Sequence, residues 1–312
     1  MSRLPPILQT LLAVALLCVI VLAGDRALAG LMRRALPYSG VRFSLALRPS
    51  TERRVLVLGN SRAATGFNAP EVQRRLGVPT LNLAYNGMST VIAEAMLRGY
   101  LAHNAPPRLL VYELDGLQSD HVLVNAMKCY WDEYPALGEL AGRLHPRSRA
   151  AMRLFHLYAF NGEAPLRALY YARRTDQNWG NFYRISPEII DAARAEAPFV
   201  IHSRDDDLAA LQRIARLARD HGFPLRLVVM PYLHEHIAHA TNYAAWVDQA
   251  RRVSGEPVWD YGHAEGDVTH FADRVHLNEQ GSVPFVARLV GDGFFADSAA
   301  APVTHPLAAA AR

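Results

Sequence analysis

The sequence predicts an α/β domain in which helices cover both faces of a parallel, five-stranded sheet. Short apolar runs rich in Val and Leu alternate with amphipathic helical patterns, and most connections between them are short. The chain has 312 residues, of which 51% are hydrophobic and 20% charged, so it can bury one large core. We therefore expect a three-layer sandwich with a helical insertion after strand three and an N-terminal transmembrane helix.

The first segment, residues 1–30, has the composition of a membrane helix. The stretch Ile7–Gly24 is almost entirely apolar, and about 18 such residues just reach the length that spans a bilayer. The alternative is a cleaved secretory signal, because Ala27–Ala29 resembles a small-residue cleavage site. Asp25 and Arg26 disfavour cleavage there, so we favour an uncleaved signal anchor. It would cross the inner (cytoplasmic) membrane once and leave the following domain exported, in the periplasm.

The remaining elements follow in order. Residues 31–53 predict a polar linker with an edge strand at Val41–Leu47, and residues 54–295 form the α/β domain. Its expected strands are Val55–Leu58, Thr80–Ala84, Arg108–Leu114, Pro224–Met230 and Pro257–Trp259. Its expected helices are Ala69–Leu76, Thr90–His103, Leu208–His221, Ala240–Val253 and a last helix that ends near Phe295. The Ala- and Pro-rich tail, 296–312, predicts disorder.

Residues 117–201 interrupt the alternation of strands and helices. This region is crowded with aromatic residues and predicts a helical insertion that caps the carboxyl edge of the sheet. The aromatic side chains are more typical of a core than of a sugar-binding platform, although an aromatic-lined carbohydrate groove is an alternative.

Charge and cysteine usage narrow the function classes. The net charge is +4, but the arginines are scattered and no nucleic-acid module is recognisable, so we expect no nucleic-acid partner. Basic surface beside a membrane segment favours anionic lipid or an acidic polymer. Cys18 lies in the apolar leader, which leaves Cys129 without an intramolecular disulfide partner; we interpret Cys129 as a core residue. We expect no cofactor.

The clearest candidate nucleophile is Ser61. The apolar run Val55–Leu58 leads directly into Gly59 and then into Ser61, which places a hydroxyl on a turn between a strand and a helix. In parallel sheets this position lies at the carboxyl edge, where α/β proteins place nucleophiles and ligand contacts. The alternative is a serine that only caps a turn.

A second motif, Asp273-x-x-His276, precedes the last helix. A serine hydroxyl needs a base to remove its proton, and histidine suits this role because its pKa lies near neutral pH. A carboxylate fixes the tautomer of the imidazole and stabilises its charged form. The spacing places Asp273 and His276 on one face of a helical turn or tight loop, at the same sheet edge as Ser61. A capping aspartate beside a solvated histidine is the alternative.

These motifs resemble the blocks of the SGNH/GDSL hydrolase superfamily. Gly59-Asn60-Ser61 follows strand one, Asn86-Gly87 follows strand two, and Asp273-x-x-His276 precedes the last helix. Within that superfamily the chain looks most like membrane-anchored, exported members that serve cell-envelope acylation, such as the proteins of D-alanyl-lipoteichoic acid synthesis and of alginate O-acetylation. The resemblance implies a flavodoxin-like sheet and covers residues 54–295, with the insertion as additional material.

The resemblance also implies residue roles. Ser61 would be the nucleophile, Asp273 and His276 would complete a triad, and the backbone N–H groups of Ser61 and Gly87 would form the oxyanion hole. One block departs from the pattern, because Asp115 stands near the position where typical members carry an asparagine donor. Asn60 or Asn86 would then have to supply that donor. Arg62, Asp115 and His234 are weaker candidates for substrate binding.

The run His234-Glu235-His236-Ile-Ala-His239 suggests a metal site but lacks the H-E-x-x-H spacing. We therefore expect no metal there, and interpret the run as a polar loop at a strand end, with His234 on the rim of the active site.

Two functions from different classes follow. The first is an exported, membrane-anchored, serine-dependent acyl (acetyl) transferase or esterase that acts on a cell-envelope glycan. Its expected partners are an acylated glycan or polymer as substrate and, implied by the resemblance only, a multispanning membrane acyltransferase. The second is an inactive scaffold that binds a glycan or a partner, and the Asp115 departure favours either a transferase or this scaffold over a free hydrolase.

Overall fold

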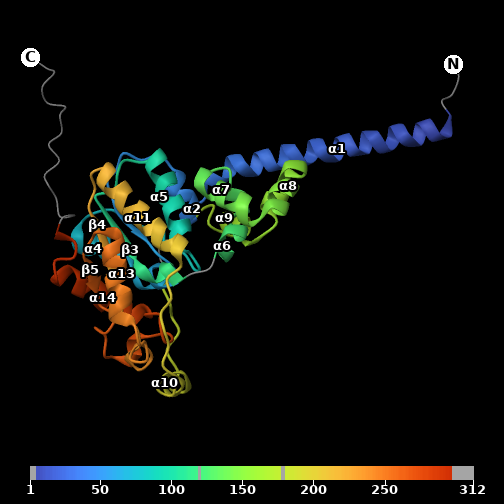
Figure 1. The fold of residues 1–312 in the computed structure, drawn as a ribbon. Coiled ribbons are helices and arrows are strands. Elements are labelled where there is room, and N and C mark those ends of the chain that lie inside the picture. The colour runs from blue at the N-terminus through green and yellow to red at the C-terminus, as the bar shows by residue number, and fades with distance from the viewer. Residues whose placement is uncertain (1–4, 119–120, 177–179, 297–312) are drawn as a thin grey trace, which may run out of the picture.

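The computed structural model describes residues 5–118, 121–176 and 180–296. Its centre is the predicted parallel five-stranded sheet, and the strand order is β2-β1-β3-β4-β5 (Figure 1). The strands are β1 (Val55–Leu58), β2 (Thr80–Asn82), β3 (Leu109–Glu113), β4 (Leu225–Val229) and β5 (Val258–Asp260). In such doubly wound sheets the connections diverge on either side of β1, so the carboxyl ends of β1 and β3 border the crevice in which ligands bind.

Alternate residues of each strand face two separate cores. In β1, Leu56 and Leu58 point into one core, while Val55 and Val57 point into the other. The first core is covered by α2 (Arg42–Leu47), α5 (Thr90–His103), α11 (Asp205–Asp220) and α13 (Tyr243–Ser254). The second is covered by α3 (Ser61–Gly66), α4 (Ala69–Leu76), α10 (Pro187–Arg194) and α14 (Glu279–Gly291). The expected three-layer sandwich is therefore confirmed.

Most of residues 31–53, predicted as a linker with an edge strand, is helical instead, so that prediction was wrong for these residues. Helix α1 (Pro6–Ala35) continues without a break to a 3-10 turn, Leu36–Tyr38, and α2 follows at once. The run Val41–Leu47 alternates like a strand, but Phe43, Ala46 and Leu47 also recur at helical spacing, and all three are buried against the first core. Packing against α5 therefore selects the helix.

The insertion is helical, as predicted. It contains α6 (Val122–Ala126), α7 (Pro135–Leu144), α8 (Pro146–Leu154), the 3-10 helix η4 (His156–Phe160) and α9 (Glu163–Tyr170), and α10 follows before the sheet resumes. Trp131 and Tyr134 are buried in the first core, as the core interpretation expects, whereas Tyr170, Phe182 and Tyr183 are exposed. Cys129 is buried too, and burial raises the pKa of its thiol to about 12.

The sequence predicted that the insertion caps the carboxyl edge of the sheet, but the helices of the insertion also pack elsewhere. Helix α7 packs on α5, and η4 packs on α1, so α6 to α9 lie beside the sheet near the end of α1 (Figure 1). The chain then passes the start of α14, where the backbone carbonyl of Asn181 accepts a hydrogen bond from the N–H of Glu279 at 2.9 Å. It ends at α10, beside α12 (His234–Ile237).

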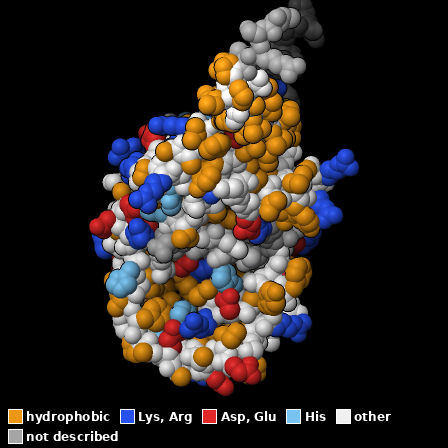
Figure 2. All heavy atoms as spheres, turned by 90° about the vertical axis from the view of Figure 1, so that its right-hand side faces the viewer, with side chains coloured by type: hydrophobic (Ala, Val, Ile, Leu, Met, Phe, Trp, Pro, Cys, Tyr) orange, Lys and Arg blue, Asp and Glu red, His pale blue; other side chains and the backbone are white. Residues whose placement is uncertain are grey.

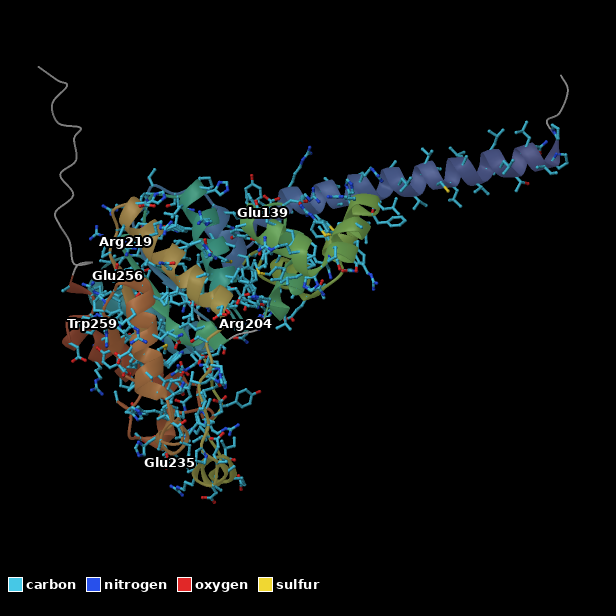
Figure 3. The ribbon with its side chains drawn as sticks, in the orientation of Figure 1. Glu139, Arg204, Arg219, Glu235, Glu256 and Trp259 are labelled. Atoms are coloured by element: carbon cyan, nitrogen blue, oxygen red, sulfur yellow. The ribbon has the colours of Figure 1, made fainter. Side chains whose placement is uncertain are left out.

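Helix α1 is long and apolar enough to cross a membrane, and no part of its apolar window is buried in the molecule. Its outer part extends away from the α/β domain, with side chains that have no neighbours in Figure 3. These properties fit a membrane anchor or a signal sequence. The predicted disordered tail lies outside the described residues, except for Ala296.

Candidate active site

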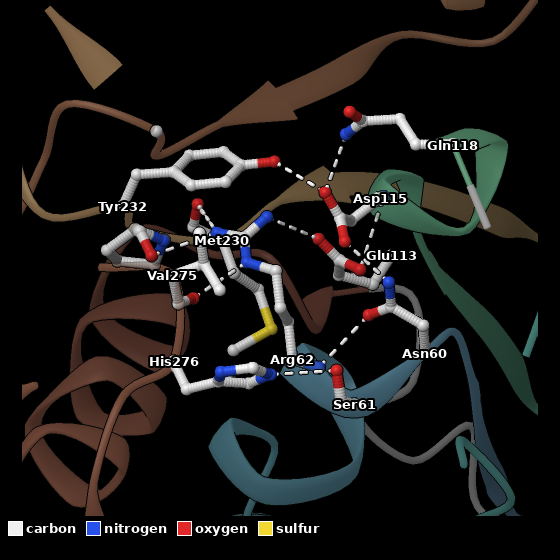
Figure 4. A network of polar contacts seen from close by, with 12 residues as sticks. Asn60, Ser61, Arg62, Glu113, Asp115, Gln118, Met230, Tyr232, Val275 and His276 are labelled. Atoms are coloured by element: carbon white, nitrogen blue, oxygen red, sulfur yellow. Dashed lines mark hydrogen bonds and ion pairs between the residues drawn. The ribbon is translucent and has the colours of Figure 1, made fainter. Parts of the chain in front are cut away.

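The structure brings Ser61, His276 and Asp273 together at the carboxyl edge of the sheet. The Oγ atom of Ser61 lies 2.7 Å from Nε2 of His276 (Figure 4). The other ring nitrogen, Nδ1, lies 2.8 Å and 3.0 Å from the two carboxylate oxygens of Asp273. These separations fall within the hydrogen-bonding range of a nucleophile, a general base and an orienting carboxylate.

The turn after β1 presents Ser61 through two local devices. Gly59 has φ +151°, and a Cβ atom there would approach side chains of α3 and β3 to 2.9 Å, so only glycine fits. Asn60 is the N-cap of α3, because its side-chain oxygen accepts the N–H of Arg62 at 3.0 Å. Ser61 is consequently the first residue of a short helix that the sequence analysis did not predict.

The loop that carries Asp273 and His276 is held by its own carboxylate. Asp273 accepts the backbone N–H groups of Val275 at 2.8 Å and of His276 at 2.9 Å, in addition to the imidazole. Burial raises the pKa of Asp273, but the hydrogen bonds from the imidazole and these N–H groups outweigh it and hold the pKa below its usual value. The carboxylate therefore stays ionised and can orient the ring.

Arg62 was a weaker candidate for substrate binding, and its burial contradicts that role. Its side chain is 1% exposed and forms an ion pair of 2.9 Å with Glu113 of β3, whose side chain is fully buried. The guanidinium also donates to backbone carbonyls of Met230, Pro231 and Val275, and it stacks 3.5 Å from the centre of the Tyr232 ring. Arg62 thus joins the serine turn to the histidine loop and to the end of β4 from inside the protein (Figure 4).

Asp115 is held by a polar network rather than left available for substrate. Its carboxylate accepts hydrogen bonds from Tyr232 at 2.9 Å, from Gln118 at 2.7 Å and from the side-chain amide of Asn60. The side-chain amide of Asn60 donates one N–H to Asp115, and its oxygen accepts the N–H of Arg62, so both groups of this side chain have partners within the fold. Sequence reasoning missed Glu113, Gln118 and Tyr232, since nothing in their local sequence marks them.

The second loop of the site is a β-turn closed by the N–H of Met88 to the carbonyl of Tyr85 at 3.0 Å. Gly87 occupies its third position with φ +72°, which favours glycine. Within the described residues we find no acceptor for the backbone N–H of Ser61 or of Gly87. Asn86 is exposed and lines a hollow of about 300 Å³ together with Glu163 and Arg167 of the insertion.

The histidines of the run after β4 lie in different environments. His234 is exposed at the start of α12, as a rim position requires, whereas His236 is bonded to Glu196 at 2.6 Å. Among the described residues a different group, His121 with Asp206 and Asp207, places three potential metal-ligand atoms within 4.8 Å of one another. His121 there is hydrogen-bonded to Ser89 at 2.9 Å and to Asp206 at 2.7 Å.

The order of the strands, the serine after β1 and the Asp-x-x-His motif before α14 form the arrangement that the SGNH/GDSL resemblance implies. No protein-family model matches the sequence, and no curated protein matches it significantly. The solved structures that match this chain include proteins assigned as an acylhydrolase and as an SGNH hydrolase, and a protein described as a platelet activating factor.

Three of these structures illustrate the likeness. A Bacteroides fragilis protein assigned as an acylhydrolase has a TM-score of 0.42 and 11% identity, over 81% of this chain and 93% of its own. A Slackia heliotrinireducens protein assigned as an SGNH hydrolase has a TM-score of 0.40 and 13% identity, over 78% and 100%. A Streptococcus pneumoniae protein described as a platelet activating factor has a TM-score of 0.41 and 12% identity, over 90% and 98%.

Proposed function

We propose that this protein is a serine-dependent O-acyltransferase or esterase of the SGNH type, which acts on a cell-envelope glycan through a Ser61 acyl-enzyme. The observation that carries the proposal is the continuous chain from Ser61 through His276 to Asp273, with both hydrogen bonds at 2.8 Å or less. Ser61 lies near the start of the domain in sequence, and Asp273 and His276 lie near its end. If any of them only capped a turn, its side chain would not need to contact the other two.

The chemistry follows from this geometry. As Oγ of Ser61 bonds to the carbonyl carbon of an acyl ester, its proton passes to Nε2 of His276, and Asp273 stabilises the resulting imidazolium. The N–H groups of Ser61 and Gly87 would stabilise the oxyanion, each donor contributing roughly 3–4 kcal/mol. When the C–O bond to the alcohol breaks, His276 returns the proton to the leaving oxygen. Water or a sugar hydroxyl then attacks the acyl-enzyme in the same way.

We further propose that α1 remains attached as an inner-membrane anchor with the domain in the periplasm. Asp25 and Ala29 are buried, and the carboxylate of Asp25 accepts the backbone N–H groups of His156 and Leu157 at 2.7 and 2.9 Å. Cleavage after Ala29 would remove this cap and uncover part of the insertion. An acyl donor supplied by a multispanning membrane protein fits this placement.

A fluorophosphonate probe that acylates activated serines tests the triad. We expect labelling of the full chain, no labelling of Ser61→Ala, and a loss of roughly 10⁴-fold or more in acyl-ester turnover for Ser61→Ala and His276→Ala. Ser186→Ala, a helix N-cap remote from the triad in sequence, serves as the control and should label normally. Failure of the unaltered protein to label at Ser61 would favour the inactive scaffold.

Acceptor dependence separates the two enzymatic outcomes. With a small acetyl ester as donor, an esterase releases acetate in water alone, whereas a transferase releases it faster when a saccharide is present and forms an acetylated sugar. Mass spectrometry of the saccharide distinguishes them. Because Asp115 replaces a neutral donor with an acceptor in the site, we expect the saccharide to be required.

A further inference from the structure

The described surface carries exposed apolar side chains beside α1, at the corner where α8 meets η4. Leu154 is 57% exposed and Phe155 is 46% exposed, and Leu28 on the adjoining part of α1 is 50% exposed. Figure 2 shows hydrophobic side chains gathered in the upper part of this face, along the projecting helix and beside it. Exposed apolar clusters of this kind mark contacts with another protein or with a membrane.

Hydrogen bonding fixes the height of this corner along α1. Asp25 follows immediately after the apolar stretch 7–24, and its carboxylate holds the N–H groups of His156 and Leu157. Residues 154–157 must therefore lie level with the end of the apolar stretch. If that stretch fills the hydrocarbon core, the corner lies in the headgroup layer, since the polar layers extend several ångströms beyond the hydrocarbon on each side.

The charge around the corner matches an anionic bilayer. Residues 143–174 contain seven arginines and a single acidic residue, Glu163. Arg147 and Arg153 of α8 are both exposed, on the same short helix that ends at Leu154. Basic residues at a membrane surface are each worth about 1 kcal/mol on anionic lipid. A protein partner would need no such combination with a neighbouring membrane helix, so the bilayer is the better match.

We propose that this corner, formed by α8 and the start of η4, is a second membrane contact that seats in the headgroup layer of an anionic bilayer. Leu154 and Phe155 enter the interface, and Arg147 and Arg153 face lipid phosphates. The inference rests on the retained anchor proposed above. Because α1 runs without a flexible linker into the domain, the second contact fixes the orientation of the domain and keeps the active site close to the membrane. The substrate would then be a membrane-proximal glycan.

Spin labels on the full chain in nanodiscs that contain phosphatidylglycerol test this contact. Variants with one accessible thiol carry a nitroxide at Leu154→Cys or Phe155→Cys in a Cys18→Ser background, because the remaining thiol, Cys129, is buried. Tyr183→Cys is the control, because Tyr183 is 80% exposed and lies outside the corner. Power saturation compares collision with oxygen, which partitions into lipid, and with a water-soluble nickel chelate.

We expect the ratio of oxygen to nickel accessibility at 154 and 155 to exceed that at 183 several-fold. The excess should fall in discs of phosphatidylcholine alone and in the Arg147→Gln/Arg153→Gln variant. Equal ratios at 154, 155 and 183 would overturn the contact, and a corner shielded from both reagents would indicate a protein partner instead. A label on native Cys18 tests the anchor independently, so a lipid-exposed Cys18 with a water-exposed corner refutes only the second contact.

Discussion

At the scale of single residues, a buried ion pair lies between the segments that form the candidate site. Arg62 and Glu113 are 1% and 0% exposed, and Arg62 also binds three backbone carbonyls from two other segments. Burial raises the pKa of Glu113, and the charge of Arg62 opposes that rise. Burial of the pair therefore costs desolvation energy, but the pair fixes the position of the Ser61 turn relative to the His276 loop.

Removing one partner of this pair should cost much more than removing an exposed arginine. We expect Arg62→Met to lower the free energy of unfolding by about 3–5 kcal/mol, because Glu113 is left buried without its counter-ion. The double variant Arg62→Met/Glu113→Gln should recover part of that loss. Urea unfolding of the full chain in detergent, followed by tryptophan fluorescence, measures both.

Arg98→Met is the matched control for that comparison. Arg98 pairs with Glu94 on α5, but its side chain is 44% exposed, and exposed pairs contribute roughly 0–1 kcal/mol. If Arg62→Met costs no more than Arg98→Met, the ion pair does not organise the site.

At the scale of elements, the N-terminus of α11 carries two adjacent carboxylates with opposite behaviour. Asp207 is fully buried: one oxygen accepts the N–H of Val91 at 3.0 Å, and the other has no hydrogen bond among the described residues, with the Nε atom of Arg204 3.7 Å away. Burial raises the pKa of Asp207 to about 6. Asp206 is also partly desolvated, but its bond to His121 lowers its pKa.

The two carboxylates should therefore affect stability with opposite dependence on pH. Because the folded protein holds the proton of Asp207 more tightly than the unfolded chain, its contribution is largest below about pH 4 and is lost as the pH rises towards 6. As the pH rises from 4 to 7, the free energy of unfolding of Asp207→Asn should consequently increase relative to that of the unaltered protein, by on the order of 2 kcal/mol. Unfolding midpoints in urea across this range measure the difference.

Asp206→Asn supplies the control of opposite sign. Its lowered pKa stabilises the fold above the unfolded value and is lost on acidification, so this variant should be least stable, relative to the unaltered protein, near pH 7. Parallel pH profiles for the two variants would contradict the assignment.

Elements with a strong periodic pattern were predictable from sequence, and those decided by distant contacts were not. The strands, α4, α5 and α11 appear within a few residues of their predicted bounds, because apolar periodicity is a local property. The Ser61, Asp273 and His276 motifs were also local. By contrast, the burial of Arg62 depends on Glu113 and Val275, which lie 51 and 213 residues away. The helical fold of Val41–Leu47 likewise depends on packing against α5.

At the scale of the whole molecule, the apolar helix and the α/β domain form one continuous structure rather than an anchor and a tethered enzyme. Helix α1 extends to Ala35, and α2 in the first core begins at Arg42. Arg33 of α1 forms an ion pair with Asp132 of the insertion at 2.9 Å, and Asp25 caps the start of η4. The domain therefore cannot rotate about the helix without breaking these contacts.

Asp25 should be the residue on which this rigid junction depends. Replacing it by alanine leaves the N–H groups of His156 and Leu157 without their acceptor, which for a capping aspartate costs about 0.5–2 kcal/mol. That loss increases local opening by roughly 2- to 30-fold, and the amides of residues 156 and 157 should exchange hydrogen faster by that factor. Hydrogen exchange of the full chain in nanodiscs, read by mass spectrometry on peptides that cover η4, measures the change.

Two variants make that outcome specific. Asp25→Asn keeps a side-chain oxygen that can accept one of the N–H groups, so exchange should rise less than in Asp25→Ala. Asp132→Asn removes the partly exposed ion pair with Arg33, worth roughly 0–1 kcal/mol, and should leave exchange at η4 close to that of the unaltered protein. If Asp25→Ala also leaves it unchanged, the insertion is held to α1 by packing alone, and cleavage after Ala29 would no longer be opposed by the cap.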